Sequence, residues 1–410
     1  MEEQNQNQSS DSALMATNGL LYRMPQPLSV CINRTFKKEY SQRQTYSETD
    51  TIVFDINSGS SYIDPKTCML SFSLFVSATG VDPGDKYTFG TGLASNLIKE
   101  IRILSKNGCE IDRTQNANAL AKILKDYTYS SDDMRNLSNA GHALAFPVGV
   151  VFKYVIPLHL ISGFFRPTVK GMKIPAGLAS GLRIEFITEK ASRALTYNGA
   201  GTDVKYRIEN PELLFMCMDL NDPTQAVLMK NSAETGLEYT FPSYFSTPHT
   251  TSSDRINEQV KKAVSQCTRA FCTVYNLEDV EDMEKDGFRS IDLADHGFGS
   301  FQFRVGSNYY PKKDVSDIPE AWYITSSCFD SMNKSNSLDI KDYENNGKFV
   351  IGVPIETDNQ LNLSGIPLNN SNVLELRASI EAVGKDLQYI IFIEHLTVSR
   401  TFVNQSSIKI

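Results

Sequence analysis

The chain has 410 residues, enough for two domains of ordinary size, and its 41% hydrophobic and 21% charged residues are typical of a folded protein. Its net charge of −8 argues against a protein that grips nucleic acid through a broad basic surface, because such affinity comes from neutralising phosphates. The seven cysteines are odd in number and contain no CxxC pair, which argues against a disulfide framework and against a zinc cluster.

The N-terminal region lacks the features of a targeting segment. Residues 1–20 contain three acidic residues, no lysine or arginine and no apolar centre, so we expect no signal peptide. The longest apolar run, residues 143–152, is broken by a proline and a glycine and is too short to cross a bilayer as a helix. Together with the free thiols, these features predict a protein made in a reducing cytoplasm.

Residues 1–24 are expected to form a mobile N-terminal arm. Segment 1–20 is rich in Gln, Asn and Ser and is too polar to fold alone. It adjoins a short apolar patch, residues 20–24, so we expect the arm to become ordered only on contact with a neighbouring molecule.

Strand patterns dominate the chain after the arm. Apolar residues alternate with more polar ones in segments 52–56, 68–77 and 182–187, and a period of two places one face of a strand in a core. Turns rich in Gly, Pro, Asn and Asp separate these segments. The pattern favours an all-β sandwich or barrel.

Helix patterns are few. Residues 116–127 place Ala117, Leu120, Ala121 and Leu124 on one stripe, which predicts an amphipathic helix. Residues 222–235 predict a helical connector near the middle of the chain, with an N-cap at Asp222-Pro223 and an end at Gly236.

An ordered series of matches relates the two halves. Hairpin 101–113, followed by a helix, matches hairpin 301–313, followed by the helical segment 319–330. Three further pairs then occur in the same order: 155–158 with 352–355, 182–187 with 374–379, and the continuous apolar runs 213–218 with 389–393. Two copies of one β-rich unit explain this order.

Each unit has about eight strand candidates and one helix in a long loop, which fits an eight-stranded jelly roll. The predicted fold is therefore all-β, with two tandem jelly rolls, short helices in loops and a helical connector. The predicted boundaries are 1–24 for the arm, 25–221 for the first jelly roll, 222–235 for the connector and 236–410 for the second jelly roll. The continuous apolar last strands are expected to be buried on both faces.

The chain resembles the double jelly-roll major capsid proteins of polinton-like viruses, adintoviruses and virophages. The stretch IPLHLISGFFRPTVKGMKIPAGLASGLRIEFITE, residues 156–189, is similar to their Pro-containing strand, Gly-aromatic loop and following strand. The segment FRVGSNYYP, residues 303–311, is similar to their second hairpin. The length places the chain among compact members without elaborate tower loops.

The resemblance implies a structural role in the virion, with synthesis and assembly inside an infected host cell. Three chains would form a pseudo-hexameric homotrimer of six jelly rolls, and trimers would tile the icosahedral shell of a DNA virus. The implied partners are other copies of the chain, penton proteins and minor capsid proteins, with no sequence-specific nucleic acid. Whether the chain contacts a membrane is left open.

No catalytic, cofactor-binding or metal-binding residue is predicted. The five histidines, at positions 142, 159, 249, 296 and 395, form no metal motif, and nucleophile-elbow and P-loop patterns are absent. His395 lies in an apolar strand and is interpreted as structural, with pH sensing as the alternative role. The two-glycine loops at 90–92 and 199–201 are interpreted as turns. We therefore expect no enzymatic activity and no cofactor.

Two charged clusters have alternative interpretations. The acidic run 278–286 is either a solvated loop or a contact for a cation or a basic minor protein. The basic residues Arg34, Lys37, Lys38 and Arg43, with Tyr40 and Tyr46 among them, either discourage wrong strand pairing or contact nucleic acid inside a shell.

Two other functions use the same architecture. A receptor- or carbohydrate-binding jelly roll, as in a spike, fibre or minor capsid component, would expose a cluster of aromatic residues, for which Tyr309, Tyr310 and Trp322 are candidates. A two-domain cupin enzyme would need closely spaced histidines and a carboxylate in one strand pair, and the sequence has no such set.

Overall fold

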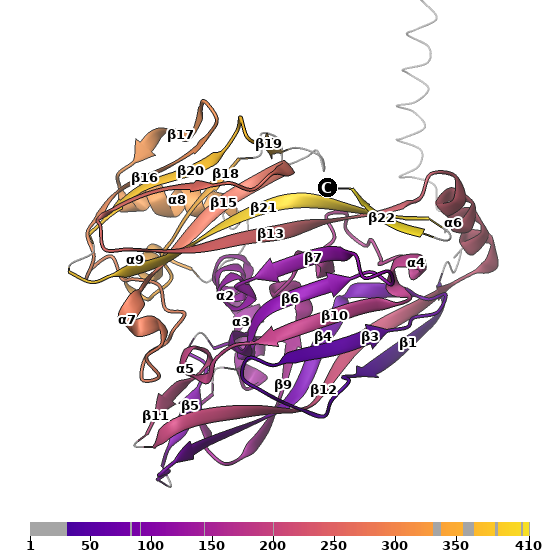
Figure 1. Ribbon diagram of the computed structural model, residues 1–410, viewed down its shortest axis with the longest axis horizontal. Coiled ribbons are helices and arrows are strands. Elements are labelled where there is room, and N and C mark those ends of the chain that lie inside the picture. The colour runs from indigo at the N-terminus through magenta and orange to yellow at the C-terminus, as the bar shows by residue number, and fades with distance from the viewer. Residues whose placement is uncertain are drawn as a thin grey trace, which may run out of the picture.

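The structure of the chain is a computed structural model that describes residues 31–409, except 83, 91, 143, 200, 331–337, 356–364, 382–383 and 403–404. The predicted arm, residues 1–24, lies outside the described residues. Antiparallel strands dominate and fall into two groups, one from each half of the chain, as Figure 1 shows. Within the described part of the chain, the helices are all too short or too polar to cross a membrane.

The first unit is a sandwich of two sheets. Its long sheet has the strand order β1-β12-β4-β9, with β2 paired to β12, and its second sheet has the order β3-β10-β6-β7. A small sheet, β11-β5-β8, extends one end. The bounds are β1 (Cys31–Tyr40), β2 (Thr45–Ser47), β3 (Thr51–Ile56), β4 (Tyr62–Thr79), β5 (Lys86–Thr88), β6 (Ile98–Leu104), β7 (Glu110–Gln115), β8 (Phe146–Pro147), β9 (Val151–Pro157), β10 (Leu182–Thr188), β11 (Thr196–Asn198) and β12 (Thr202–Leu220).

The second unit repeats this plan. Its long sheet has the order β13-β21-β15-β18, with β19 paired to β15 and β22 to β21, and its second sheet has the order β14-β20-β16-β17. The bounds are β13 (Leu237–Thr251), β14 (Arg255–Val260), β15 (Val264–Asn276), β16 (Phe298–Val305), β17 (Asn308–Val315), β18 (Val350–Pro354), β19 (Ile366–Leu368), β20 (Leu374–Ile380), β21 (Leu387–Phe402) and β22 (Gln405–Lys409).

The two units have the same strand order, so the predicted fold class, two eight-stranded jelly rolls, is confirmed. In the first unit β1 pairs with β12, β12 with β4, and β4 with β9. In the second unit the equivalent strands β13, β21, β15 and β18 pair in the same order. The predicted hairpins are β6–β7 and β16–β17, and the other matched segments lie on β9 and β18, on β10 and β20, and on β12 and β21. All four sequence matches therefore fall on equivalent strands.

The helices lie in the loops between strands. The described helices are η1 (Ala94–Leu97), α2 (Ala117–Thr128), α3 (Ser131–Asn139), η2 (Leu158–Leu160), η3 (Gly163–Phe165), α4 (Ala176–Ala179), α5 (Ala191–Ala194), α6 (Asp222–Glu234), α7 (Leu277–Val280), α8 (Ile318–Cys328) and α9 (Ile340–Asn345). The predicted helices 116–127, 222–235 and 319–330 correspond to α2, α6 and α8. Helix α3 was not predicted because it buries none of its residues and so has no apolar stripe.

Two details of the predicted helices are wrong. The N-cap of α6 is Asn221, whose side-chain oxygen accepts a hydrogen bond from the Thr224 N–H, and Asp222 is the first helical residue. Helix α2 is not amphipathic in its burial, because Lys122, Lys125 and Asp126 are buried together with its apolar stripe. The reason is that α2 lies between the two units and packs against both, as described below.

The last strands differ in burial. Residues Tyr389–Ile393 of β21 are all buried, as predicted. On one face, α8 packs on the sheet and Phe329 at its end contacts Phe271, the cross-strand neighbour of Phe392. On the other face, Tyr389 bonds Glu258 of β14. The prediction is wrong for β12, where Leu214 and Met216 are only half-buried. The outer face of the first long sheet has no such cover among the described residues.

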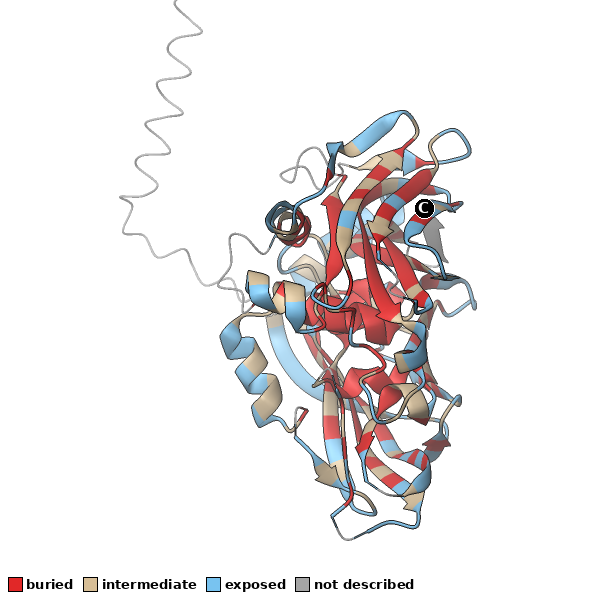
Figure 2. Ribbon diagram, turned by 90° about the vertical axis from the view of Figure 1, so that its left-hand side faces the viewer, coloured by how far each residue is buried: buried red, intermediate tan, exposed pale blue. Residues whose placement is uncertain are grey.

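The two units pack tightly where η3 meets β13. Figure 2 shows buried residues continuing from one unit into the other. The ring of Phe164 lies 5.2 Å from that of Tyr239 and 5.1 Å from that of Phe241. A Cβ atom added at Gly163 would overlap the carbonyl oxygen of Pro242, so only glycine permits this approach.

We predict that Gly163→Ala destabilises the protein by about 2–3 kcal/mol, since a methyl group there forces the two units apart. Urea unfolding measures the effect. The matched control is Gly84→Ala, at a glycine with open space around its Cβ position and no positive φ. Equal midpoints for Gly163→Ala and wild type would contradict the close packing of η3 on β13.

Candidate functional site

Helix α2 carries the polar part of the junction between the units. The Lys122 ammonium donates to the carbonyl oxygen of Gly347, and the Tyr127 hydroxyl donates to that of Lys348 at 3.0 Å. The Tyr127 ring lies 4.8 Å from the ring of Phe329, at the end of α8. Burial lowers the pKa of Lys122, although the carboxylates of Asp126 and Asp286 oppose the effect. The helix thus forms hydrogen bonds and ring contacts with the second unit.

A buried carboxylate links the units on the other side of α2. Asp112 of β7 accepts hydrogen bonds from Ser162, at 2.7 Å, and from Ser243 of β13, at 2.6 Å. Burial raises the pKa of Asp112, and the two serine hydroxyls partly offset this effect. Because Ser243 belongs to the second unit, this hydrogen bond fixes the position of β13 against β7.

The acidic run 278–286 is partly solvated, as one interpretation expected, because Glu278, Glu281 and Glu284 are exposed. Asp286 is half-buried near Lys122 and Lys125, and its desolvation raises its pKa. Lys285 pairs with Asp279 at 2.5 Å, and Glu281 pairs with Lys190 of the first unit at 3.1 Å. The loop therefore packs on the first unit, and lysines of this chain balance much of its charge.

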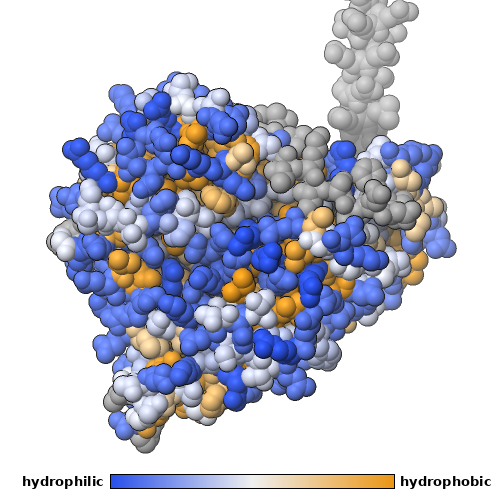
Figure 3. Space-filling view, in the orientation of Figure 1, coloured by the Kyte–Doolittle hydropathy of each residue, from blue (hydrophilic) through white to orange (hydrophobic). Residues whose placement is uncertain are grey.

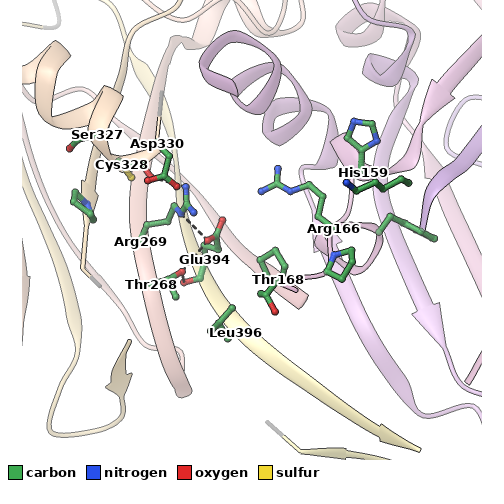
Figure 4. A pocket seen from close by; sticks show the side chains of 15 residues that line it. His159, Arg166, Thr168, Thr268, Arg269, Ser327, Cys328, Asp330, Glu394 and Leu396 are labelled. Carbon is green, nitrogen blue, oxygen red and sulfur yellow. Dashed lines mark hydrogen bonds and ion pairs between the residues drawn. The ribbon is translucent and has the colours of Figure 1, made fainter. Parts of the chain in front are cut away.

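A cavity of about 530 Å³ lies between the units. Figure 4 shows its two walls: His159, Arg166 and Thr168 come from the first unit, and Arg269, Asp330 and Glu394 from the second. The guanidinium group of Arg166 points across the cavity toward the opposite wall. Its Nη2 donates to the hydroxyl oxygen of Tyr244 at 2.9 Å.

The second wall contains a buried ion pair. Nε of Arg269 lies 2.8 Å from Oε1 of Glu394, and Nη1 of Arg269 donates to the carbonyl oxygen of Cys328 at 2.7 Å. Burial raises the pKa of the Glu394 carboxyl, but the charges of Arg269 and Arg166 outweigh it, so the pKa lies below its ordinary value. Glu394 is therefore ionised at neutral pH.

The histidines lie apart, and most have structural hydrogen bonds. His142 accepts from the Ala94 N–H at 3.1 Å, and His296 contacts the carbonyl oxygen of Glu381 at 2.8 Å. Burial lowers the pKa of His395 to about 4, with the charge of Lys262 acting in the same direction, so its imidazole is neutral at physiological pH. Among the described residues, no group of three His, Cys, Asp or Glu side chains could hold a metal ion.

The two-glycine loops pack against carboxylates rather than forming a phosphate cradle. Gly90 faces Asp286, and Gly199 faces Asp85 and the hydroxyl of Tyr197. The aromatic candidates for ligand binding come from two different elements. Tyr309 and Tyr310 lie on β17, whereas Trp322 lies on α8, so they do not share a loop cluster.

The outer face of the first long sheet is open and carries large apolar side chains. Ile32, Phe36 and Tyr40 of β1 are 64%, 48% and 70% exposed, and the half-buried Leu214 and Met216 lie beside them on β12. Of the predicted basic residues, Arg34 and Lys38 lie on the same face as Phe36, and Lys38 pairs with Glu212 at 3.4 Å. Lys37 lies on the opposite face of the strand, beside Phe215. Arg43 lies beyond the strand and stacks on Tyr46. We call this surface, residues 32, 34, 36, 38 and 40 with 214 and 216, the open face.

The sequence contains no direct indication of the cavity. Its one signal was the presence of single charges in apolar strands, such as Glu394 in YIIFIEHL and Arg269 in CTRAFC. Such charges are buried only when they are paired. Their pairing across 125 residues depends on the strand register between β15 and β21, which a single sequence does not specify.

We predict that Glu394→Gln lowers the free energy of unfolding by about 3–5 kcal/mol at pH 7, because it leaves the buried Arg269 unpaired. The pKa of Glu394 is lowered in the folded state, so its contribution is complete above its ordinary value of 4.5 and is lost as the pH falls below it. The difference between variant and wild type in urea unfolding should therefore shrink below about pH 4.5. Glu238→Gln, at an exposed pair with Arg400, is the control and should cost less than about 1 kcal/mol. A difference that stays constant down to pH 3 would contradict this role.

Comparison with known proteins shows similarity in structure alone. No family model and no curated protein sequence matches the chain. Among solved structures, the Faustovirus major capsid protein is 8% identical with a TM-score of 0.67, and the match covers 92% of each chain. PBCV-1 VP54, fitted into a reconstruction of the virophage Sputnik, is 10% identical with a TM-score of 0.62, covering 92% of this chain and 97% of that one. A chain of the Sputnik virophage structure is 9% identical with a TM-score of 0.58, covering 95% and 90%. The protein therefore has the double jelly-roll fold of these viral proteins along nearly its whole length.

Proposed function

We propose that the protein is the major capsid protein of an icosahedral DNA virus and acts as a structural subunit without enzymatic activity. The observation that carries this proposal is the pair of jelly rolls with one strand order, held side by side in a single chain. The shared fold with the Faustovirus major capsid protein supports it. The proposed units are residues 25–221 and 236–410, joined by the connector 222–235.

The proposed building block is a homotrimer. Two similar jelly rolls per chain give six around a threefold axis, and such a trimer has a nearly hexagonal outline that can tile a flat face. The junction supports this role, because hydrogen bonds, aromatic contacts and a buried carboxylate hold the two jelly rolls as one block. The proposed location is the virion, after assembly inside the host cell.

The open face is the proposed contact with a neighbouring copy. Figure 3 shows that the face formed by the sheet β3-β10-β6-β7 is mostly hydrophilic, with small separate apolar patches. The open face, on the other sheet, places three exposed large apolar side chains on one strand. Contiguous exposed apolar surface is typical of protein–protein contacts. Penton and minor capsid proteins are further proposed partners, and contacts between trimers would complete the shell.

The loops 197–202 and 278–286 are proposed to lie together at the outer rim of the trimer. Tyr197 donates its backbone N–H to the carbonyl oxygen of Met283 at 2.7 Å, so the two loops are in contact. They come from different units and occupy the same end of the molecule.

We predict that the purified protein has a mass of about three times 45.8 kDa by size-exclusion chromatography with light scattering. Each interface should bury more than about 2,000 Å², as in obligate oligomers. A monomer at high concentration in near-physiological buffer would contradict the trimer, and electron microscopy of assembled particles tests the shell.

We predict that Phe36→Asp shifts the trimer toward monomer, because it places a charge in an apolar contact. Val81→Asp is the matched control, since Val81 is also exposed, at 41%, but lies in a loop away from the open face. Light scattering across a dilution series separates the two variants. If the Phe36→Asp trimer is as stable as the Val81→Asp control, the open face is not part of the interface.

A further inference from the structure

The cavity between the two jelly rolls has the size of a small-molecule site. Its volume of about 530 Å³ lies within the range of about 300–1,000 Å³ that is typical of ligand pockets. The lining residues come from both units, so a molecule bound there would touch both. Neither the packing of the jelly rolls nor the proposed trimer requires this space.

Two guanidinium groups face the cavity, and each has N–H donors without a partner among the described residues. In the described part of the chain, Arg166 uses only Nη2, which donates to Tyr244, so Nε and Nη1 have no partner. Arg269 uses Nε and Nη1, for Glu394 and the carbonyl of Cys328, which leaves Nη2 without a partner among the described residues. The two groups extend from opposite walls.

The charges that line the cavity favour an anion. The cations Lys66, Arg166 and Arg269 face the anions Asp330 and Glu394, which leaves a net charge of +1. Glu394 is matched by Arg269, and solvent screens both Asp330 and Lys66, which are exposed, so the charge that remains at the cavity is that of the half-buried Arg166. Lys66 and Arg166 have no ion-pair partner within the described residues.

His159 does not alter this balance. It lies on the same wall as Arg166 and its Nε2 contacts the hydroxyl of Tyr129 at 2.9 Å. Burial lowers the pKa of His159 to about 4, and the charges of Arg166 and Lys66 act in the same direction, so the ring is neutral at physiological pH. A neutral ring adds a surface for packing without adding charge.

The rest of the lining is apolar and stiff. Phe165, Pro167, Pro242, Pro354 and Leu396 contribute an aromatic ring, three prolines and a branched side chain. Such a surface suits a hydrocarbon or aromatic group and loses little conformational freedom when it is covered.

We propose that this cavity binds a small organic carboxylate with an apolar body, whose carboxylate lies between Arg166 and Arg269. A guanidinium group presents planar donors that match a carboxylate, which favours this anion over a bulkier one. The site is distinct from the assembly surfaces and goes beyond the structural role proposed above. Its ligand joins the two jelly rolls by contacts to both, so occupancy stabilises their relative position.

Calorimetric titration of the full-length protein with 4-phenylbutyrate tests the proposal. Acetate supplies the carboxylate without the apolar body, and 4-phenylbutanol supplies the apolar body without the charge. We expect 4-phenylbutyrate to bind with one site per chain and both analogues to bind at least about tenfold more weakly, since each lacks one half of the recognition. Equal affinity for 4-phenylbutanol, or the absence of binding by 4-phenylbutyrate at millimolar concentration, would overturn the proposal.

Variants locate the binding to this cavity. Arg166→Gln should weaken 4-phenylbutyrate binding by about tenfold or more, and Lys66→Gln, at an exposed side chain that does not affect folding, should weaken it by a smaller factor. Arg207→Gln is the matched control, because Arg207 is an exposed arginine on β12 that stacks on Phe75 outside the cavity, and its affinity should equal that of wild type. Wild-type affinity in both Arg166→Gln and Lys66→Gln would show that the probe binds elsewhere. The outcome does not depend on trimer formation, since one chain supplies every lining residue.

Discussion

The burial of helix α2 between the two jelly rolls is the constraint on which the rest of the structure depends. A helix at the surface of one sandwich would keep its lysines in water. Here Lys122 and Lys125 are buried by the second unit, and each buried charge is costly unless it is paired or hydrogen-bonded. The Gly347 carbonyl, Asp126 and Asp286 meet that requirement, and two of these three groups belong to the second unit. Separating the units would therefore remove the partners of the helix as well as its apolar contacts.

The two long sheets differ in what covers their outer faces. The Phe392 face of β21 stacks on Phe271, which contacts Phe329, and Phe329 in turn contacts Tyr127 of α2. The outer face of the second long sheet is therefore covered by α8 of its own unit, and α2 contacts this cover through Tyr127. Among the described residues, no helix covers the outer face of β12 in the same way, and Leu214 and Met216 there are half-buried. Two units with the same strand order thus have one covered sheet and one open sheet.

The sequence predicted what depends on local pattern and order. The ordered matches between hairpins, strands and apolar runs predicted two equivalent jelly rolls, because a period of two and a turn are local properties. It did not predict what depends on the placement of one unit on the other. The sequence of α2 shows one apolar stripe, so it predicted that Lys122 would be solvated. The acidic run was likewise interpreted as solvated, although Asp286 lies beside that lysine. The cavity was missed for the same reason, since Arg166 and Glu394 lie on opposite walls that come from different units.

The covalent link between the jelly rolls has a thermodynamic consequence for the proposed assembly. A ring of six separate jelly rolls would lose the translational and rotational freedom of five associations, each estimated at several kcal/mol or more. With two jelly rolls in one chain, three of the six contacts form during folding and only three form between chains. The contacts within a chain need not resemble those between chains, so the two kinds can evolve separately. Here α2, the Asp112–Ser243 bond and the cavity form between units of one chain, whereas the open face is the proposed contact between chains.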